Sequence, residues 1–226
     1  MIPSHIRSFA TALVVWAAIP GMAAPMVMAA EQWKVTGGTV TLTFRAEAAS
    51  AAGLQILGAT EEISASGDIQ WILVLPVQPG PGLTFEVADG NVNPVAHGEA
   101  ALAGSIGFAT PQGQIILSHL AAKPGDGKSL VRLVIGSADA QPTSGLLLDR
   151  IKLGFDGVSQ MLVIHAGSVF LSSDVADALG RKDAARFDLG SVTLQAPAVW
   201  VGGDSPDGGP GGGPGGPQEP GPLGVQ

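Results

Sequence analysis

This chain of 226 residues contains neither cysteine nor tyrosine. Without cysteine, no disulfide can form within the chain or to a partner, and no lipid can be attached through a cysteine. Other aromatic side chains are few, with four tryptophans and seven phenylalanines. Because sugar rings stack on aromatic faces, a carbohydrate-binding role is not favoured. Stability must come mainly from burial of aliphatic side chains.

Basic residues are scarce as well. The chain has 11 lysines and arginines against 19 aspartates and glutamates, a formal net charge of −8. Without Arg7 and the rest of the first thirty residues, ten basic residues oppose nineteen acidic ones, a net charge of −9. Nucleic acids and anionic membrane surfaces bind clusters of lysine and arginine, and no block of like charge occurs here. We therefore expect no nucleic-acid partner.

The first thirty residues have the pattern of an export signal. His5 and Arg7 form a short polar start, residues 9–19 are an uninterrupted apolar run, and Pro20 interrupts a helix there. Small residues that suit signal peptidase follow, with cleavage possible after Ala23, Ala29 or Ala30. We therefore expect a protein that is secreted or periplasmic, and the sequence leaves the choice between these two places open.

An uncleaved membrane anchor is the alternative for the same segment. Residues 9–30 would be long enough to cross a bilayer as a helix. However, Pro20, Gly21 and Pro25 interrupt such a helix, and no lysine or arginine follows closely to stop transfer. Arg7 has no arginine neighbour, which disfavours a twin-arginine export route. We therefore expect cleavage and no stable membrane span afterwards.

From residue 33 onward the pattern is that of successive β-strands. Residues 39–44 alternate between apolar side chains and threonine, which is typical of a half-buried strand. Residues 69–77 are almost continuously apolar, as expected of a strand covered on both sides. Further strands are expected at 83–87, 101–109, 115–121, 130–135, 146–155, 161–165 and 188–195. We predict an all-β fold, an antiparallel β-sandwich or a barrel-like sheet.

Turns and one or two short helices complete this pattern. Asp89-Gly90 and Asp156-Gly157 are typical of tight turns between strands. A helix is expected at 172–179, where Ser172 would cap the free amide groups and Gly180 would end the helix. A second helix near 47–57 is weaker because Gly53 lies within it.

The composition divides the chain into three parts. We expect a signal peptide at 1–30, one β domain at 31–200 and a tail at 201–226. The tail consists largely of glycine and proline, so it cannot bury enough apolar surface to become ordered. Glycine does not recur at every third position, which argues against a collagen triple helix. We predict a disordered tail that serves as a spacer or a free end.

Three histidines of the β domain are the candidate metal ligands: His97, His119 and His165. Metal sites need two or more such side chains brought together. His97 lies in a turn-like segment, and the other two lie near predicted strand ends. His119 and His165 could meet across a sheet, although none of the three is near another in sequence. Ordinary polar positions at strand ends explain them equally well, and no cofactor is predicted.

Other polar motifs have structural explanations. Asp89, Asn91 and Asn93 place oxygen donors at alternate positions, but they lack the distal glutamate of a calcium loop and suit a hairpin turn. No nucleophile elbow occurs. Ser118 and His119 would point to opposite faces if they lay on one strand. The adjacent pair Glu61-Glu62 is expected to face water. The sequence contains no catalytic motif.

One segment carries a family resemblance. Residues 98–120 contain Gly104-Ser-Ile-Gly-Phe108, a short turn and Gly113-Gln-Ile-Ile-Leu117. This segment resembles the β-hairpin core of the HtaA-type secreted domains, in which a late strand and helix such as residues 169–179 often follow. The resemblance implies an exported β fold. Some members of that family bind haem through a tyrosine with a supporting histidine, and since this chain has no tyrosine, that ligand is not carried over.

The sequence favours an exported, non-enzymatic β protein. Its expected role is that of a binding or structural module outside the cytoplasm, with an unidentified extracellular ligand or surface component as partner. One alternative is a haem or metal carrier that uses His97, His119 or His165. Another is a hydrolase whose groups converge only in three dimensions. Neither the ligand nor the oligomeric state follows from the sequence.

Overall fold

The structure is a computed structural model. It describes residues 30–58, 61–65, 68–125, 130, 133–137 and 144–202. Residues 1–29 of the predicted signal peptide and residues 203–226 of the predicted tail lie outside these residues. Within the described part of the chain, no helix is long and apolar enough to cross a membrane.

Most described residues belong to antiparallel strands, with two short α-helices and one 3-10 helix. The strands are β1 (Glu31–Val35), β2 (Thr39–Arg45), β3 (Gln55–Leu57), β4 (Glu61–Ala65), β5 (Asp68–Pro76), β6 (Leu83–Ala88), β7 (Asn91–Gly98), β8 (Ala100–Ala101), β9 (Ile106–Thr110), β10 (Gly113–Leu117), β11 (Leu120–Pro124), β12 (Leu133–Ser137), β13 (Leu146–Asp156), β14 (Met161–Leu171) and β15 (Gly190–Gly202). The helices are α1 (Ala46–Ala51), α2 (Ser173–Ala178) and the 3-10 helix η1 (Lys182–Arg186).

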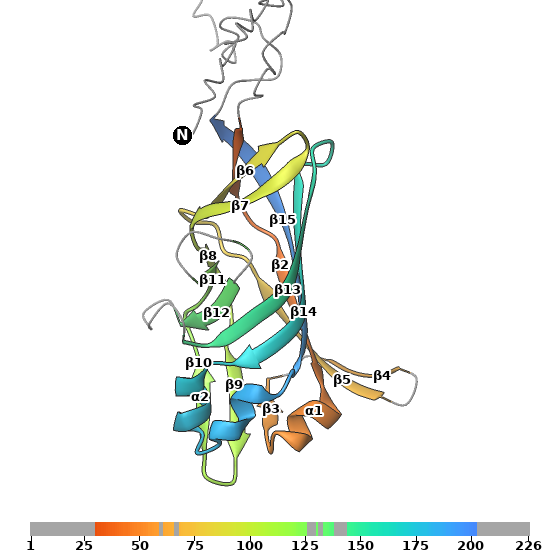
Figure 1. Cartoon of the computed structure of the whole chain (residues 1–226), viewed down its shortest axis with the longest axis vertical. Helices are drawn as coiled ribbons and strands as arrows, with labels where there is room; N and C mark the ends of the chain where they lie inside the picture. Colours follow the sequence, from red (N-terminus) through yellow and green to blue (C-terminus); the bar gives the residue numbers. More distant parts are fainter. Residues whose placement is uncertain are drawn as a thin grey trace, which may run out of the picture.

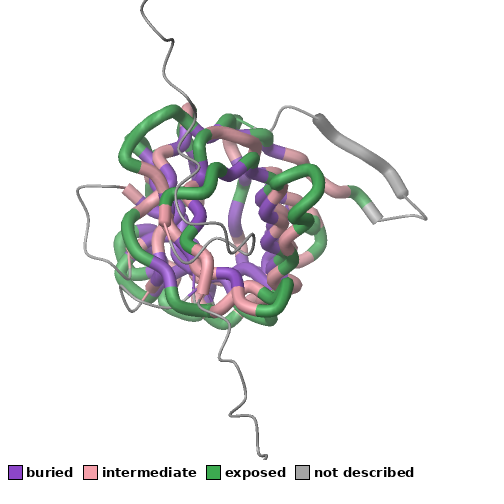
Figure 2. Tube along the Cα trace, turned by 90° about the horizontal axis from the view of Figure 1, so that it is seen from above, coloured by how far each residue is buried: buried purple, intermediate pink, exposed green. Residues whose placement is uncertain are grey.

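The large sheet curls into a nearly closed barrel. Its strands follow the order β4-β5-β2-β15-β14-β13-β12-β11-β8. The end of β5 then meets β8, where Val77 and Leu102 form a bridge and the Gln78 amide donates to the Ala101 carbonyl at 2.8 Å. Viewed from above, the strands surround a buried core (Figure 2). The predicted all-β antiparallel class is confirmed, and the barrel-like arrangement describes this sheet.

The barrel interior is filled by side chains. Alternate residues of β2, such as Val40, Leu42 and Phe44, are fully buried, as their alternating pattern predicts. The central void has a volume of only about 10 Å³, close to the space that one water molecule needs. Nine side chains line it: Val40, Ala122, Leu133, Ile135, Leu148, Ile164, Ala166, Val192 and Leu194. Ligand pockets have volumes of several hundred Å³, so this void is too small for haem or a comparable ligand.

A left-handed residue changes which side chains of β13 point inward. Arg150 has a φ of 55°, and the pairing of β13 with β14 skips this position. Before Arg150 the inward residues include Leu146 and Leu148, whereas after it they include Ile151 and Leu153. The register of β13 with β14 is the same on both sides of this position, so no residue is inserted, and the left-handed backbone at Arg150 accompanies the change of face. The long β13 can thus face the core along its whole length.

Two smaller assemblies close the ends of the barrel (Figure 1). At the upper end in Figure 1, β1 pairs with the last residues of β15, and β6 and β7 continue that sheet. Trp33 and Phe85 there pack on Phe155, with ring centroids 4.7 and 5.6 Å apart respectively. At the lower end lie α1, α2, η1 and the three-stranded sheet β10-β9-β3. Phe108 of this sheet meets Phe44 edge to face at 6.2 Å.

Both ends of the described chain leave from the same pole. Gln32 of β1 is paired with Gly202 of β15, so the two flanking segments begin side by side. This upper pole in Figure 1 is opposite α1 and α2. β15 extends to Gly202, two residues past the domain boundary that the sequence suggests at 200. We call the pole with α1, α2 and β3 the distal pole.

Several local predictions need correction. The expected strand at 101–109 is divided into β8 and β9, and the expected strand at 115–121 is divided into β10 and β11. Between the latter, His119 has a φ of 49°, which ends the extended backbone. The weak helix at 47–57 contains α1 only up to Ala51, because Gly53 is left-handed and β3 follows.

The second predicted helix is confirmed with one change. α2 covers Ser173–Ala178, and Gly180 is left-handed with a φ of 69°. Ser172 precedes the helix, but its side chain makes no capping hydrogen bond to α2. Its hydroxyl oxygen instead accepts from the Gly145 amide at 2.9 Å, which connects the helix to the start of β13.

Candidate functional site

The densest polar network of the described residues centres on the Asp188 carboxylate. Oδ1 accepts from the amides of Val169 at 3.2 Å and Gly190 at 3.3 Å. Oδ2 accepts from the Ser168 hydroxyl at 2.9 Å and pairs with Nη2 of Arg45 at 3.1 Å. The carboxylate is thereby satisfied by four donors from β14, β15 and the end of β2.

The backbone around Asp188 brings these donors together. Asp188 lies between η1 and β15, and Arg45 lies at the end of β2. The Arg45 amide donates to the Leu189 carbonyl at 2.8 Å, and its Nη2 donates to the Asp188 carbonyl at 2.5 Å. Gly190 allows a close approach here, since a Cβ at this position would lie 1.9 Å from the Thr43 carbonyl oxygen. The junction between β2 and β15 is therefore fixed by both backbone and side chains.

A groove opens beside this network. It has a volume of about 560 Å³. The strand β5 contributes Ile69, α1 contributes alanines and Glu47, and the network contributes its ion pair. The complete lining is Arg45, Ala46, Glu47, Ala48, Ala51, Ile69 and Asp188. This size falls within the range of small-molecule sites.

The ion pair orients Arg45 more than it stabilises the protein. The side chains of Arg45 and Asp188 are 50% and 28% exposed, and such exposed pairs contribute only about 0–1 kcal/mol. The contacts to Asp188 use only Nη2 of Arg45. Within the described part of the chain, Nε and Nη1 make no hydrogen bond, so they are available to a ligand in the groove that Arg45 lines. Glu47 supplies a carboxylate of opposite charge in the same groove.

A second hollow of about 420 Å³ lies nearby at the distal pole. It is lined by Gly53, Leu54 and Thr110, among others. The Arg181 guanidinium lies over Gly53, because a Cβ there would be 2.2 Å from Nη1. Arg181 also pairs with Asp183 at 3.3 Å, and this hydrogen bond lowers the pKa of the Asp183 carboxyl. The residues that line the hollow itself are all uncharged.

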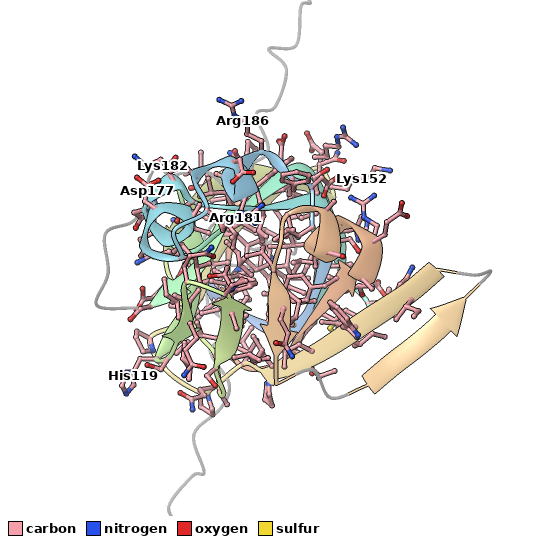
Figure 3. The ribbon with its side chains drawn as sticks, turned by 90° about the horizontal axis from the view of Figure 1, so that it is seen from below. His119, Lys152, Asp177, Arg181, Lys182 and Arg186 are labelled. Atoms are coloured by element: carbon pink, nitrogen blue, oxygen red, sulfur yellow. The ribbon has the colours of Figure 1, made fainter. Side chains whose placement is uncertain are left out.

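The structure does not bring the three candidate histidines together. His97 is an exposed residue of β7 and is paired with Thr84 of β6. His165 lies in β14 between Lys152 and Thr193, and its Nδ1 is 3.1 Å from the Thr193 hydroxyl. His119 lies between β10 and β11, at the outer edge of the molecule as seen from below in Figure 3. No group of three or more His, Asp or Glu side chains suited to a metal is found among the described residues.

The other sequence motifs have local partners. Asn91 donates to the Asp89 carbonyl at 3.1 Å, and Asn93 donates to Glu86 at 3.1 Å, so these amides stabilise the turn and the hairpin of β6 and β7. Ser118 and His119 lie between β10 and β11 rather than within one strand. The side chains of Glu61 and Glu62 lie outside the described residues. The metal role of the histidines and the hydrolase alternative both stay predictions.

Sequence reasoning did not find the groove. The sequence pattern places Asp188 at the start of a strand, and nothing in the pattern marks Arg45 or Glu47 as a candidate ligand-binding residue. Asp188 is 143 residues away from Arg45 in sequence, and the two meet only because β15 pairs with β2. The one sequence signal was Asp-Leu-Gly at 188–190, in which a glycine follows an aspartate at a strand start.

Comparisons with known proteins add no assignment, because no family model, no curated protein and no solved structure matches this chain.

Proposed function

We propose that this chain is an exported, non-enzymatic binding module, secreted or periplasmic, whose ligand binds in the groove beside α1. The observation that carries the proposal is the four-donor network on Asp188, which holds the Arg45 guanidinium at the groove. A guanidinium fixed in this way loses little conformational freedom when it binds a ligand. The filled barrel interior leaves the surface as the place for a ligand.

The groove favours a small ligand that carries both signs of charge. Arg45 offers donors for a carboxylate, and Glu47 offers an acceptor for an ammonium group. Asp188 neutralises Arg45, and the Glu47 side chain has no ion-pair partner within the described part of the chain, so a simple anion would meet a net negative groove. The three alanines and Ile69 provide an apolar wall for the body of the ligand. A dipeptide or a free peptide end has this chemistry.

Calorimetric titration of the exported chain with alanyl-alanine, and with acetate for comparison, tests this proposal. We expect the dipeptide to bind, Arg45→Gln to abolish its binding, and Glu47→Gln to weaken it. Arg186→Gln is the matched control, since Arg186 is exposed on η1 at the same pole and lies outside the groove. If Glu47→Gln instead strengthened the binding of acetate, the groove would be assigned to a simple anion. Binding unchanged in Arg45→Gln would exclude the groove.

A further inference from the structure

The strand β10 is an open sheet edge at the distal pole. β10 pairs with β9 on one side, and no described residue pairs with its other side. An unpaired strand edge presents free amide and carbonyl groups that bind another extended strand. The order β10-β9-β3 places this edge on the outside of the small sheet.

The other edges in the described part of the chain carry features that block strand addition. β7 contains Pro94, which has no amide hydrogen to donate. β4 begins with two glutamates, and the free part of β13 contains Arg150 and Lys152. β3 has only three residues. Charges, prolines and shortness are the usual protections of an edge.

β10 has none of these protections. Its sequence, Gly-Gln-Ile-Ile-Leu, contains no charge and no proline. Ile116 is 57% exposed, one of the most exposed large apolar side chains among the described residues. Ile115 and Leu117 are instead partly buried against the core. The strand therefore presents Gln114 and Ile116 outward while its other face is anchored.

The pairing with β9 determines which backbone groups are free. A two-residue turn, Pro111-Gln112, joins the strands and closes on the pair Thr110 and Gly113. Such a turn closes on a hydrogen-bonded pair, and hydrogen bonding alternates along the strands. The amide and carbonyl groups of Gln114 and Ile116 therefore point away from β9.

We propose that β10 pairs with β10 of a second copy of this chain, antiparallel about a two-fold axis at Ile115. In this register Gln114 of each copy lies opposite Ile116 of the other, and the free amides and carbonyls of these two residue pairs form four hydrogen bonds, two at each pair. Two small sheets would thereby merge into one continuous sheet. The contact is isologous, because the same residues serve in both copies.

The edge is self-complementary, because its free amide and carbonyl groups lie symmetrically about Ile115, and its lack of charge lets a second copy approach. The chain after residue 30 carries nineteen acidic and ten basic residues, so most identical surfaces repel each other. β10 is an uncharged edge at which two copies meet without facing like charges within the strands. The chain's own tail is a poor occupant, since residues 203–226 include six prolines that cannot donate hydrogen bonds.

Sedimentation equilibrium of the full chain as exported tests the proposal. We expect a dimer that dissociates on dilution and that Ile116→Lys converts to a monomer. Val74→Lys is the control, because Val74 is 41% exposed on β5 and lies outside the small sheet. A monomer at all concentrations would overturn the proposal, and so would a dimer that Ile116→Lys leaves intact.

The register is tested by cross-linking, which the absence of cysteine makes simple. We expect a mixture of Gln114→Cys and Ile116→Cys chains to form a disulfide on the order of tenfold faster than either variant alone, because only unlike positions lie directly opposite. Both side chains are exposed, so neither change disturbs the core. Equal rates in the mixture and in the separate variants would refute this register. Capture of an unrelated extended peptide by a monomeric chain would refute the second copy as occupant.

Discussion

At the residue scale, Asp188 connects three strands through one carboxylate. Ser168, one of its donors, is fully buried, and the amide of Val169 is directed at the same carboxylate. A buried donor without an acceptor costs about 1–3 kcal/mol. The structural role of Asp188 is therefore separable from the role of Arg45, whose side chain is half exposed.

We predict that Asp188→Ala lowers the free energy of unfolding by about 2–4 kcal/mol, because it leaves the Ser168 hydroxyl and the Val169 amide without their acceptor. Urea denaturation measures this change. Asp149→Ala, at an exposed position of β13, is the control and should change stability by less than about 0.5 kcal/mol. Equal effects of the two substitutions would show that the network on Asp188 is not structural.

The turn after β13 provides a prediction for a single titration. The Ser159 hydroxyl donates to Asp156 at 2.6 Å and the Val158 amide donates at 3.0 Å, and these bonds lower the pKa of Asp156. We predict that Ser159→Ala raises this pKa toward its ordinary value, as NMR titration of the carboxyl carbon would record. An unchanged pKa would mean that the Ser159 bond is not formed in solution.

The direction of this shift sets its effect on stability. A carboxyl whose pKa is lower in the folded state stabilises the fold above its unfolded pKa of about 3.9, and that contribution disappears as the pH falls through the folded pKa. The pKa of Asp174 is also lowered: burial, the largest single effect, raises it, but hydrogen bonds from the Ser144 and Ser172 hydroxyls and from the backbone amides of Asp174 and Val175 together outweigh burial. We therefore expect stability to fall below about pH 4, less steeply in Ser159→Ala.

At the scale of elements, one aromatic contact joins the small sheet to the barrel. Phe108 of β9 and Phe44 of β2 are both fully buried and meet edge to face. We predict that Phe108→Ala lowers the free energy of unfolding by about 3–5 kcal/mol, because it removes this contact and leaves a cavity. Val199→Ala, at an exposed position of β15, is the control in the same urea series. A loss below about 1 kcal/mol, the size of a surface effect, would contradict this packing of Phe108 against Phe44.

Strands were predictable from sequence periodicity where one face of the strand is exposed to solvent. The alternation at 39–44 predicted β2, and Gly180 predicted the end of α2, because both signals are local. The division at His119 was not predictable, since the apolar pattern continues through a residue whose backbone is left-handed. The change at Arg150 in which side chains of β13 point inward was not predictable for the same reason.

The candidate site was less accessible to sequence reasoning than the fold. The three histidines stand out by residue type, yet they lie on separate strands. Arg45 and Asp188 are ordinary residues in sequence, and they meet only through the pairing of β2 with the distant β15. The barrel closes through a short contact between the end of β5 and β8, and no periodicity in the sequence indicates that contact.

At the scale of the whole molecule, the two poles differ in what they offer. The upper pole in Figure 1 carries the first and last described strands, and any flanking segment extends from there. The groove and the β10 edge both lie at the distal pole. A module attached through either chain end would therefore present both surfaces away from its attachment.

The most direct test of this account maps amide chemical shifts of the purified chain during titration with alanyl-alanine. We predict that the shifts concentrate at Arg45, Glu47 and Asp188, with none among the barrel-lining residues such as Ala166. Shifts centred on the barrel interior, or on His97, His119 or His165, would contradict it.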